Sequence, residues 1–144
     1  MLSAAWRARP KMLHMLDTDT ASYLIKGKSP LVEARLSALV PAMVCISVIT
    51  RAELLYGLKR LTGEHRLHLA VRQFLKIVNV LDWDSDAANW YADIRHQLTS
   101  DGLPIGELDI MIAAHSLSAG AVLVTNNQRH FARIKAPLVI ENWS

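Results

Sequence analysis

The stretch MLHMLDTDT, residues 12–20, is a short apolar run that ends in two aspartates separated by one residue. Parallel strands that are covered on both faces have nearly continuous apolar sequences, and open α/β sheets bind ligands beyond the carboxyl ends of such strands. We therefore predict a buried strand that delivers Asp17, with Asp19 as a second candidate, to a site. The local alternative is that one of these aspartates caps the helix expected to begin near Ala21.

Composition favours one globular domain. The chain has 144 residues, of which 51% are hydrophobic and 20% charged, enough to bury a core without disulfides. No apolar run approaches the roughly 20 residues that span a bilayer, and the first residues lack the pattern of a secretory signal. The single cysteine, Cys45, lies in an apolar run and is typical of a buried, inert thiol in a reducing compartment. We therefore expect a cytoplasmic protein without a membrane partner.

Residues 1–11, MLSAAWRARPK, precede the first predicted strand. We interpret them as an N-terminal extension of little structural weight and a candidate for disorder. Met12 and Met15 are alternatives to Met1 as the first residue of the natural protein. Residues 12–144 would then form the single domain.

Short apolar runs alternate with helical patterns along the rest of the chain. Further strands are predicted at 43–49, 77–81 and 121–124, with a last edge strand at 137–140. Helices are predicted between them, at 21–26, 30–40, 50–61, 64–76, 85–98 and from about residue 107. This alternation is typical of a three-layer α/β/α fold with a mainly parallel central sheet.

Acidic residues recur where these strands end and helices begin. Thr50 and Glu53 form a T-x-x-E pattern that predicts a capping box, which by itself would explain Glu53. Glu107 and Asp109 occupy the first turn of a helix, where the helix dipole favours acids. The argument for a site is instead their convergence with Asp17, because strand ends of a parallel sheet lie on one edge.

A cluster of carboxylates requires a cation. Two carboxylates about 4 Å apart repel by about 4 kcal/mol at an effective dielectric near 20. Oxygen ligands without a coherent set of Cys or His side chains favour Mg²⁺ or Mn²⁺ over Zn²⁺. The net charge of +3 favours a polyanionic partner such as a nucleic acid. On charge alone, an ordinary soluble basic protein is an equally good interpretation.

Four segments together carry a family resemblance: LDTDT (16–20), ISVITRAELLYGLKR (46–60), GLPIGELDIMIAAHSL (102–117) and LVTNNQRHFARI (123–134). In order and spacing they resemble the PIN-domain ribonucleases, in particular the VapC-type toxins of bacterial type II toxin–antitoxin systems. The resemblance runs from about residue 12 to the C-terminus. It implies Mg²⁺-dependent endonucleolytic cleavage of structured RNA such as tRNA, with Mn²⁺ as the expected substitute. It also implies a homodimer, neutralisation by a cognate antitoxin, and a higher assembly on operator DNA through that antitoxin.

The resemblance also assigns roles to individual residues. Asp17, Glu53 and Asp109 would be the metal-binding and catalytic acids. Thr125 would be a hydroxyl residue that supports the site through hydrogen bonding. Asn127 stands where many family members have a further Asp, so it offers a carbonyl oxygen without a charge, and the number of metal ions stays open.

Glu107 matches no fixed acid of the family and is an accessory candidate for the site. RNA phosphate contacts are expected among basic residues near the motifs: Lys26, Lys28, Arg51, Lys59, Arg129 and Arg133.

Other functions remain open. A DNA-directed metal nuclease of the same fold would use the same acids, and a non-catalytic module could bind RNA or a protein partner without turnover. The DTDT segment also resembles the DxDx(T/V) start of haloacid-dehalogenase-like phosphatases. In this chain, however, Ala21 occupies the fifth position, and the later motifs would have no role in a phosphatase.

Overall fold

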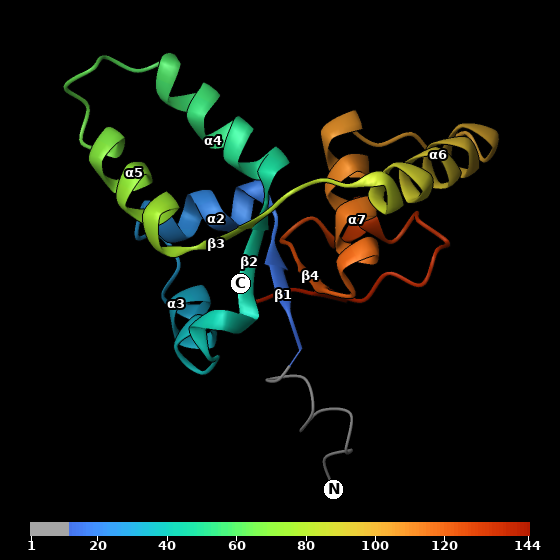
Figure 1. Cartoon of the computed structure of the whole chain (residues 1–144), viewed down its shortest axis with the longest axis horizontal. Helices are drawn as coiled ribbons and strands as arrows, with labels where there is room; N and C mark the ends of the chain where they lie inside the picture. The colour runs from blue at the N-terminus through green and yellow to red at the C-terminus, as the bar shows by residue number, and fades with distance from the viewer. Residues whose placement is uncertain (1–11) are drawn as a thin grey trace, which may run out of the picture.

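The computed structural model describes residues 12–144 (Figure 1), and the predicted N-terminal extension lies outside the described residues. Within it, five strands form a sheet in the order β3-β2-β1-β4-β5, and every pairing is parallel. The strands are β1 (His14–Leu16), β2 (Val44–Ser47), β3 (Asn79–Leu81), β4 (Val122–Val124) and β5 (Ile140–Glu141). The predicted parallel sheet is therefore confirmed.

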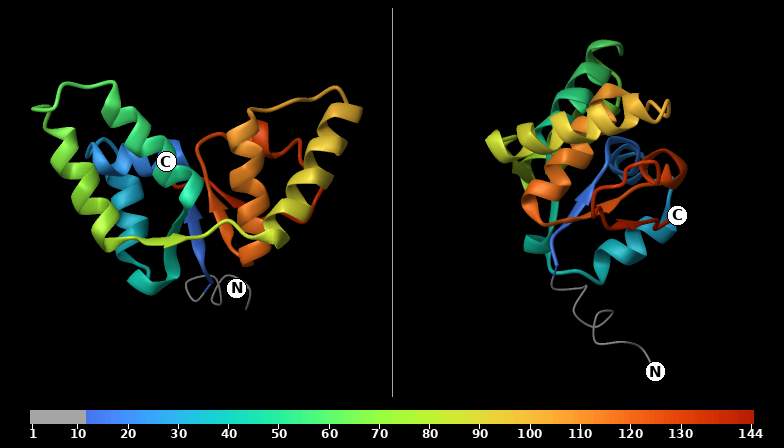
Figure 2. Two further views of the ribbon diagram at one scale, coloured as in Figure 1. Left: turned by 45° about the horizontal axis from the view of Figure 1, so that its top comes forward. Right: turned by 90° about the vertical axis from the view of Figure 1, so that its right-hand side faces the viewer.

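Helices connect the strands and cover both faces of the sheet. They are α2 (Thr18–Ile25), α3 (Pro30–Ser37), the short 3-10 helix η2 (Pro41–Met43), α4 (Val48–Lys59), α5 (Leu67–Ile77), α6 (Ser85–Ser100), α7 (Glu107–Ala119) and α8 (Gln128–Phe131). Figure 2 shows α4 and α5 as one group and α6 and α7 as another, diverging from the strands. Among residues 12–144, no helix is long and apolar enough to span a membrane.

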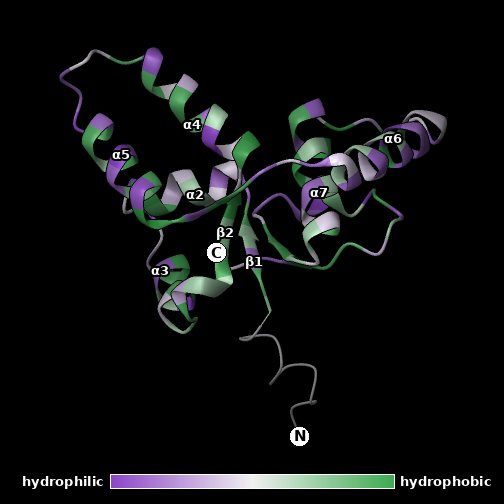
Figure 3. Cartoon of the chain, viewed as in Figure 1, coloured by the Kyte–Doolittle hydropathy of each residue, from purple (hydrophilic) through white to green (hydrophobic). Residues whose placement is uncertain are grey.

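Alternate strand residues enter two different cores, as the two-residue period of a strand requires. Met15, Cys45 and Leu123 pack with α6 and α7, which we call the α6–α7 core. The neighbouring strand residues, including Leu16 and Ile46, pack with helices α2 to α5 in the α2–α5 core. Figure 3 shows the apolar central strands between helices that carry polar outer surfaces. The predicted three-layer α/β/α architecture is confirmed.

The second strand is shorter than the sequence predicts. The apolar run at 43–49 predicts one long strand, but β2 ends at Ser47 and α4 begins at Val48. The reason is that the Ser47 hydroxyl accepts the Ile49 N–H at 3.1 Å and so caps the helix. The predicted capping box between Thr50 and Glu53 is therefore wrong, because both residues lie inside the helix.

The chain order makes the junction of β1 and β4 the topological switch point of the sheet. From β1 the chain builds β2 and β3 on one side, and then returns to pair β4 with the opposite side of β1. Leu16 and Val124 pair at the carboxyl end, and the Asp17 N–H donates to the Val124 carbonyl at 3.0 Å. Ligands of parallel α/β sheets bind at such a switch point, so Asp17 and Thr125 both enter this position directly from their strands.

Candidate functional site

Asp17 is buried at the switch point and bonded on both sides. It is 4% exposed. One carboxylate oxygen accepts the Thr20 N–H at 2.9 Å, and the other accepts the Thr125 hydroxyl at 2.5 Å. Burial raises the pKa of Asp17, whereas the hydrogen bonds from Thr125 and Thr20 oppose that rise. Asp17 thus caps α2, as its local interpretation predicts, and also faces the end of β4.

Glu53 is oriented toward the same strand end by a hydroxyl from another helix. Its carboxylate accepts the Thr18 hydroxyl at 2.6 Å, and the Thr18 oxygen is also 3.1 Å from the Thr50 oxygen. Because Thr18 directly follows Asp17, this bond ties the middle of α4 to the start of α2. Sequence reasoning missed Thr18, although a hydroxyl residue beside the aspartate at the strand end was the available signal.

Asp109 lies in the first turn of α7, half-buried and close to the other acids. Its pKa is raised to about 6, first by burial and then by the negative charges of Asp17, Glu53 and Asp19, while His130 opposes the rise. Carboxylates from three elements thus lie near enough for their charges to act on the pKa of Asp109. We call Asp17, Asp19, Glu53 and Asp109 the acid cluster.

The turn after β4 supplies an uncharged hydroxyl to this cluster. Thr125 is fully buried, and its hydroxyl oxygen accepts the Asn127 N–H at 2.9 Å while its proton is donated to Asp17. Asn127 precedes α8, but its side chain makes no capping hydrogen bond. Within the described residues, the buried amide oxygen of Asn126 has no hydrogen-bond partner. Thr125 is therefore the residue through which this turn contacts an acid, and the turn adds no negative charge.

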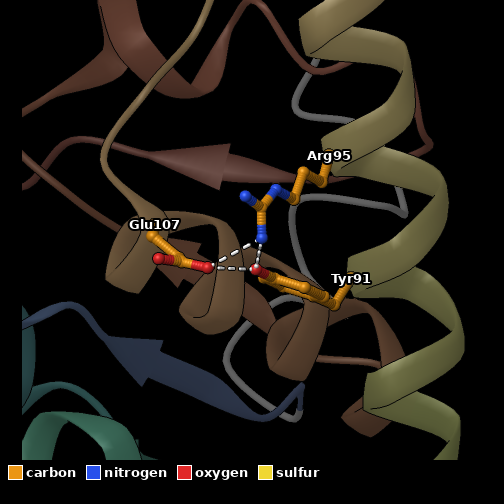
Figure 4. Close-up of polar contacts among 3 residues, drawn as sticks. All are labelled: Tyr91, Arg95 and Glu107. Carbon is orange, nitrogen blue, oxygen red and sulfur yellow. Dashed lines mark hydrogen bonds and ion pairs between the residues drawn. The ribbon is translucent and has the colours of Figure 1, made fainter.

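Glu107, two positions before Asp109, is used differently. Its carboxylate accepts the Tyr91 hydroxyl at 2.6 Å and Arg95 at 2.9 Å, and Arg95 also donates to the Tyr91 oxygen at 2.8 Å (Figure 4). These contacts fasten the start of α7 to α6. The structure does not bring Glu107 into the acid cluster.

A cavity of about 360 Å³ lies beside the acid cluster, between α2, α4 and α5. Its lining includes Asp19 and Glu53 together with two basic residues, Lys26 and Arg60. Lys26 is among the expected phosphate contacts, whereas Arg60, at the end of the helix that carries Glu53, was missed. In contrast, Arg133 donates to the Pro104 carbonyl at 2.9 Å, so its guanidinium is already engaged within the protein.

The donors at this site fit a hard divalent cation. The converging groups are carboxylate and hydroxyl oxygens, which are typical ligands of Mg²⁺ and Mn²⁺, and a cation would relieve the repulsion that helps to raise the pKa of Asp109. Between residues 12 and 144, no three His, Cys, Asp or Glu side chains stand close enough to enclose an ion. The acids therefore converge without forming a closed ligand set. A cation held there could stabilise charge on a phosphate.

Comparison with protein families matches residues 14–137 to the PIN domain. The tRNA(fMet)-specific endonuclease VapC of Salmonella typhimurium is 41% identical over 129 residues, which cover 90% of this chain and 96% of that protein. Ribonuclease VapC2 of Haemophilus influenzae is 38% identical over 130 residues, covering 90% of this chain and 97% of the relative.

Solved structures show the same fold. DNA-bound VapBC from Salmonella typhimurium contains a chain that matches with a TM-score of 0.85 and 39% identity, covering 92% of this chain and 99% of that one. VapBC2 from Rickettsia felis, bound to a promoter DNA fragment, matches with a TM-score of 0.83 and 31% identity, covering 92% and 100%. The likeness therefore extends over both cores and the elements that carry the acid cluster.

Proposed function

The chain belongs to the PIN-domain family, and from that premise we propose that it is a divalent-metal-dependent endoribonuclease, the toxin of a type II toxin–antitoxin pair. The observation that carries this proposal is the convergence of Asp17, Glu53 and Asp109 at the switch point of the parallel sheet. Relatives that match nearly the whole chain are named as ribonucleases or tRNA-specific endonucleases. Family and geometry thus support the same chemistry.

The proposed substrate is a structured RNA, with tRNA as the first candidate. Relatives from Salmonella typhimurium and Shigella flexneri are named tRNA(fMet)-specific endonucleases. In this chain Lys26 and Arg60 line the cavity beside the acids, where they can neutralise phosphates that flank the cleaved bond. Because tRNA is found in the cytoplasm, we propose that compartment for the protein.

Each site residue has a proposed role in holding the ion and the phosphate. Asp17 and Asp109 would hold the metal, and Glu53 would bind it directly or through water. Thr125 orients Asp17 by its 2.5 Å hydrogen bond, as Thr18 orients Glu53. These hydroxyls fix the carboxylate rotamers before substrate arrives.

Mg²⁺ is the proposed ion, and Mn²⁺ the expected substitute. When bound, such an ion supplies charge stabilisation at the scissile phosphate and activates water. Asp109, with its pKa of about 6, is ionised at pH 7.5 and contributes a full negative charge. Asn127 contributes no charge, so a second ion beside it would bind more weakly than in a site with an aspartate.

An apolar groove of about 340 Å³ between α2, α3 and α5 supports an antitoxin partner. Leu24, Leu36 and Phe74 line it, and Ile77 at its border is 84% exposed. We propose that the antitoxin lays an amphipathic helix there and extends an Arg or Lys to the acid cluster. The toxin would act as a homodimer, and the antitoxin would connect the assembly to operator DNA.

The first test is cleavage of total bacterial RNA by the purified protein with Mg²⁺, with Mn²⁺ and with EDTA. Asp109→Asn removes one charge of the acid cluster, and Glu107→Gln is its matched control, two positions away in the same helical turn. We expect discrete RNA fragments that require metal, disappear with Asp109→Asn and persist with Glu107→Gln. Intact RNA in every lane, from folded wild-type protein, would contradict the proposal.

The same experiment separates the alternative functions. Cleavage of DNA with RNA left intact would assign a DNA nuclease of the same fold. Stoichiometric RNA binding without turnover would assign a binding module. For the antitoxin, replacing the basic residue that reaches the acid cluster should restore nuclease activity to the complex, and no restoration would count against that contact.

A further inference from the structure

The helices that carry Glu53 and Asp109 are joined by two buried side chains, Ser47 and His115. His115 lies on α7 and is 2% exposed, and its Nδ1 is 2.7 Å from the hydroxyl oxygen of Ser47, which is fully buried. Ser47 is the residue that ends β2 and caps α4. This one contact therefore connects the start of α4 with the middle of α7.

The surrounding hydrogen bonds favour Ser47 as the donor to His115. The Ser47 hydroxyl accepts the Ile49 N–H and can donate its own proton to His115 Nδ1. The His115 ring also hydrogen-bonds the backbone of Asp82, just beyond β3. Burial lowers the pKa of His115, which favours a neutral ring with one accepting and one donating nitrogen. Two hydrogen bonds of the His115 ring thus connect Ser47, at the start of α4, with the backbone of Asp82, just after β3.

Most of the apolar packing of these two helices lies in different cores. Leu54 and Leu58 of α4 belong to the α2–α5 core, whereas Ile112 and Ala113 of α7 belong to the α6–α7 core, against which only Ile49 of α4 packs. The helical turn that carries Glu53 thus packs mainly in one core and the turn that carries Asp109 in the other. The bond from His115 spans the boundary between the cores.

We propose that His115 is a positioning residue of the nuclease, which through Ser47 sets the placement of Glu53 relative to Asp109 without touching RNA or metal. The inference rests on the proposed function of the acid cluster. A second bond supports α7 at the same place, because the Trp83 indole N–H donates to the Met111 carbonyl at 3.0 Å. The end of β3 therefore serves as a common anchor for α7.

The test compares two substitutions of His115 with a control at another buried histidine. His115→Phe keeps the ring volume and removes both hydrogen bonds, whereas His115→Asn keeps a polar group opposite Ser47. The control is His14→Asn, because His14 is also 2% exposed but lies in β1 at the amino end of the sheet, away from the acids. For each variant we would measure Mn²⁺ affinity by calorimetry without RNA, and kcat and KM for RNA cleavage.

We expect His115→Phe to lower Mn²⁺ affinity and kcat by about 10- to 100-fold, the range for lost supporting contacts and small misplacements of catalytic groups. KM for RNA should stay at the wild-type value, and His115→Asn should recover part of the loss. His14→Asn should lower Tm but leave Mn²⁺ affinity and kcat unchanged. A purely structural role for His115 would affect Tm alone.

Wild-type metal affinity and kcat in folded His115→Phe would overturn the inference, whatever its Tm. If that variant does not fold, Ser47→Ala decides in its place, because it removes the same hydrogen bond with little change in volume: lower Mn²⁺ affinity and kcat support the inference, and wild-type values overturn it. The proposed function is tested independently of this inference. If wild-type protein binds Mn²⁺ but cleaves no RNA, the proposed function is wrong, and the Mn²⁺ affinities of the variants still test the positioning role of His115. If wild-type protein binds no metal at all, the inference is overturned together with the metal-dependent function.

Discussion

Asp109 and Glu107 lie two positions apart in the first turn of α7, yet they occupy opposite environments. Glu107 is exposed and its charge is balanced by Arg95 and bonded by Tyr91. Asp109 is half-buried, and three of the four charged groups that act on its pKa are other carboxylates. Local helix propensity favours both acids equally. The difference shows that the charge environment, and not the position in the helix, distinguishes the two acids. Glu107 has a basic partner that balances its charge, whereas the charge of Asp109 is opposed by other carboxylates.

The acid cluster is a cost to the folded state when no cation is present. Its carboxylates repel one another, and burial weakens the solvent screening that exposed acids have. Stability comes instead from the two apolar cores on either side of the sheet. Removing a charge from such a cluster should therefore raise Tm, whereas removing a charge from an ordinary surface ion pair should lower it slightly.

The largest effect is expected for Asp109→Asn, which keeps the side-chain shape and removes the charge. RNA cleavage should fall below detection, while Tm at pH 7.5 without metal should rise. The raised pKa of about 6 corresponds to a gain of about 1–2 kcal/mol in the free energy of unfolding when the charge is removed, after a discount for the half-exposed side chain. Single-turnover cleavage and thermal denaturation check both parts. A variant that is inactive and also less stable would contradict this account of Asp109.

Next in size is Thr125→Val, which removes the hydroxyl that donates to Asp17 at 2.5 Å. Loss of a supporting contact of this kind typically lowers metal affinity about 10- to 100-fold. Stability should also fall, by about 1.5–3 kcal/mol for a buried hydrogen bond to a charged group. Mn²⁺ calorimetry and urea unfolding measure the two effects, with Thr125→Ser expected to recover both. Unchanged affinity would mean that Asp17 is held without Thr125.

A pH effect should follow from the same contrast between Asp109 and Glu107. Folded Asp109 keeps its proton up to a pKa of about 6, compared with the ordinary 3.8 expected for the unfolded chain. The folded state therefore binds more protons in this window, and stability falls as pH rises from about 4 to about 6 and then levels off. Urea unfolding without divalent metal should show the wild type losing stability relative to Asp109→Asn across this window. A difference that is constant with pH would argue against a buried charged cluster.

The smallest effect is expected for Glu107→Gln. It removes an exposed ion pair with Arg95, so Tm should fall by no more than about 2 °C, as is usual for solvent-exposed pairs. RNA cleavage should continue at the wild-type rate. Loss of cleavage with the fold intact would return Glu107 to the site as an accessory residue.

The sequence predicts the architecture well, because the strand signals are local. Apolar runs that stop at polar residues identify β1 and β4, and Cys45 is buried as expected, with a pKa raised to about 12 by burial. Convergence of Asp17, Glu53 and Asp109 could also be predicted, because strand ends of a parallel sheet share one edge. These inferences need only patterns that are contiguous in the chain.

The remaining details depend on contacts between distant segments. Val48 and Ile49 fit both a strand and a helix, so the end of β2 is decided by the Ser47 cap and not by hydrophobicity. The partners of Glu53 and Glu107 come from other helices, Thr18 of α2 and Arg95 of α6, at separations with no fixed period. Such pairings exist only once the helices have packed.

The division of the acids between the two halves of the chain also has a consequence during translation. Asp17 and Glu53 belong to elements made first, whereas Asp109 and Thr125 come from α7 and the turn after β4. Proteins leave the ribosome from the N-terminus, and their early segments begin to fold while synthesis continues. A nascent chain with its first half folded would present Asp17, Asp19 and Glu53 but would lack Asp109 and Thr125. The ribosome, itself built of RNA, would therefore meet an active enzyme only when the polypeptide is nearly complete.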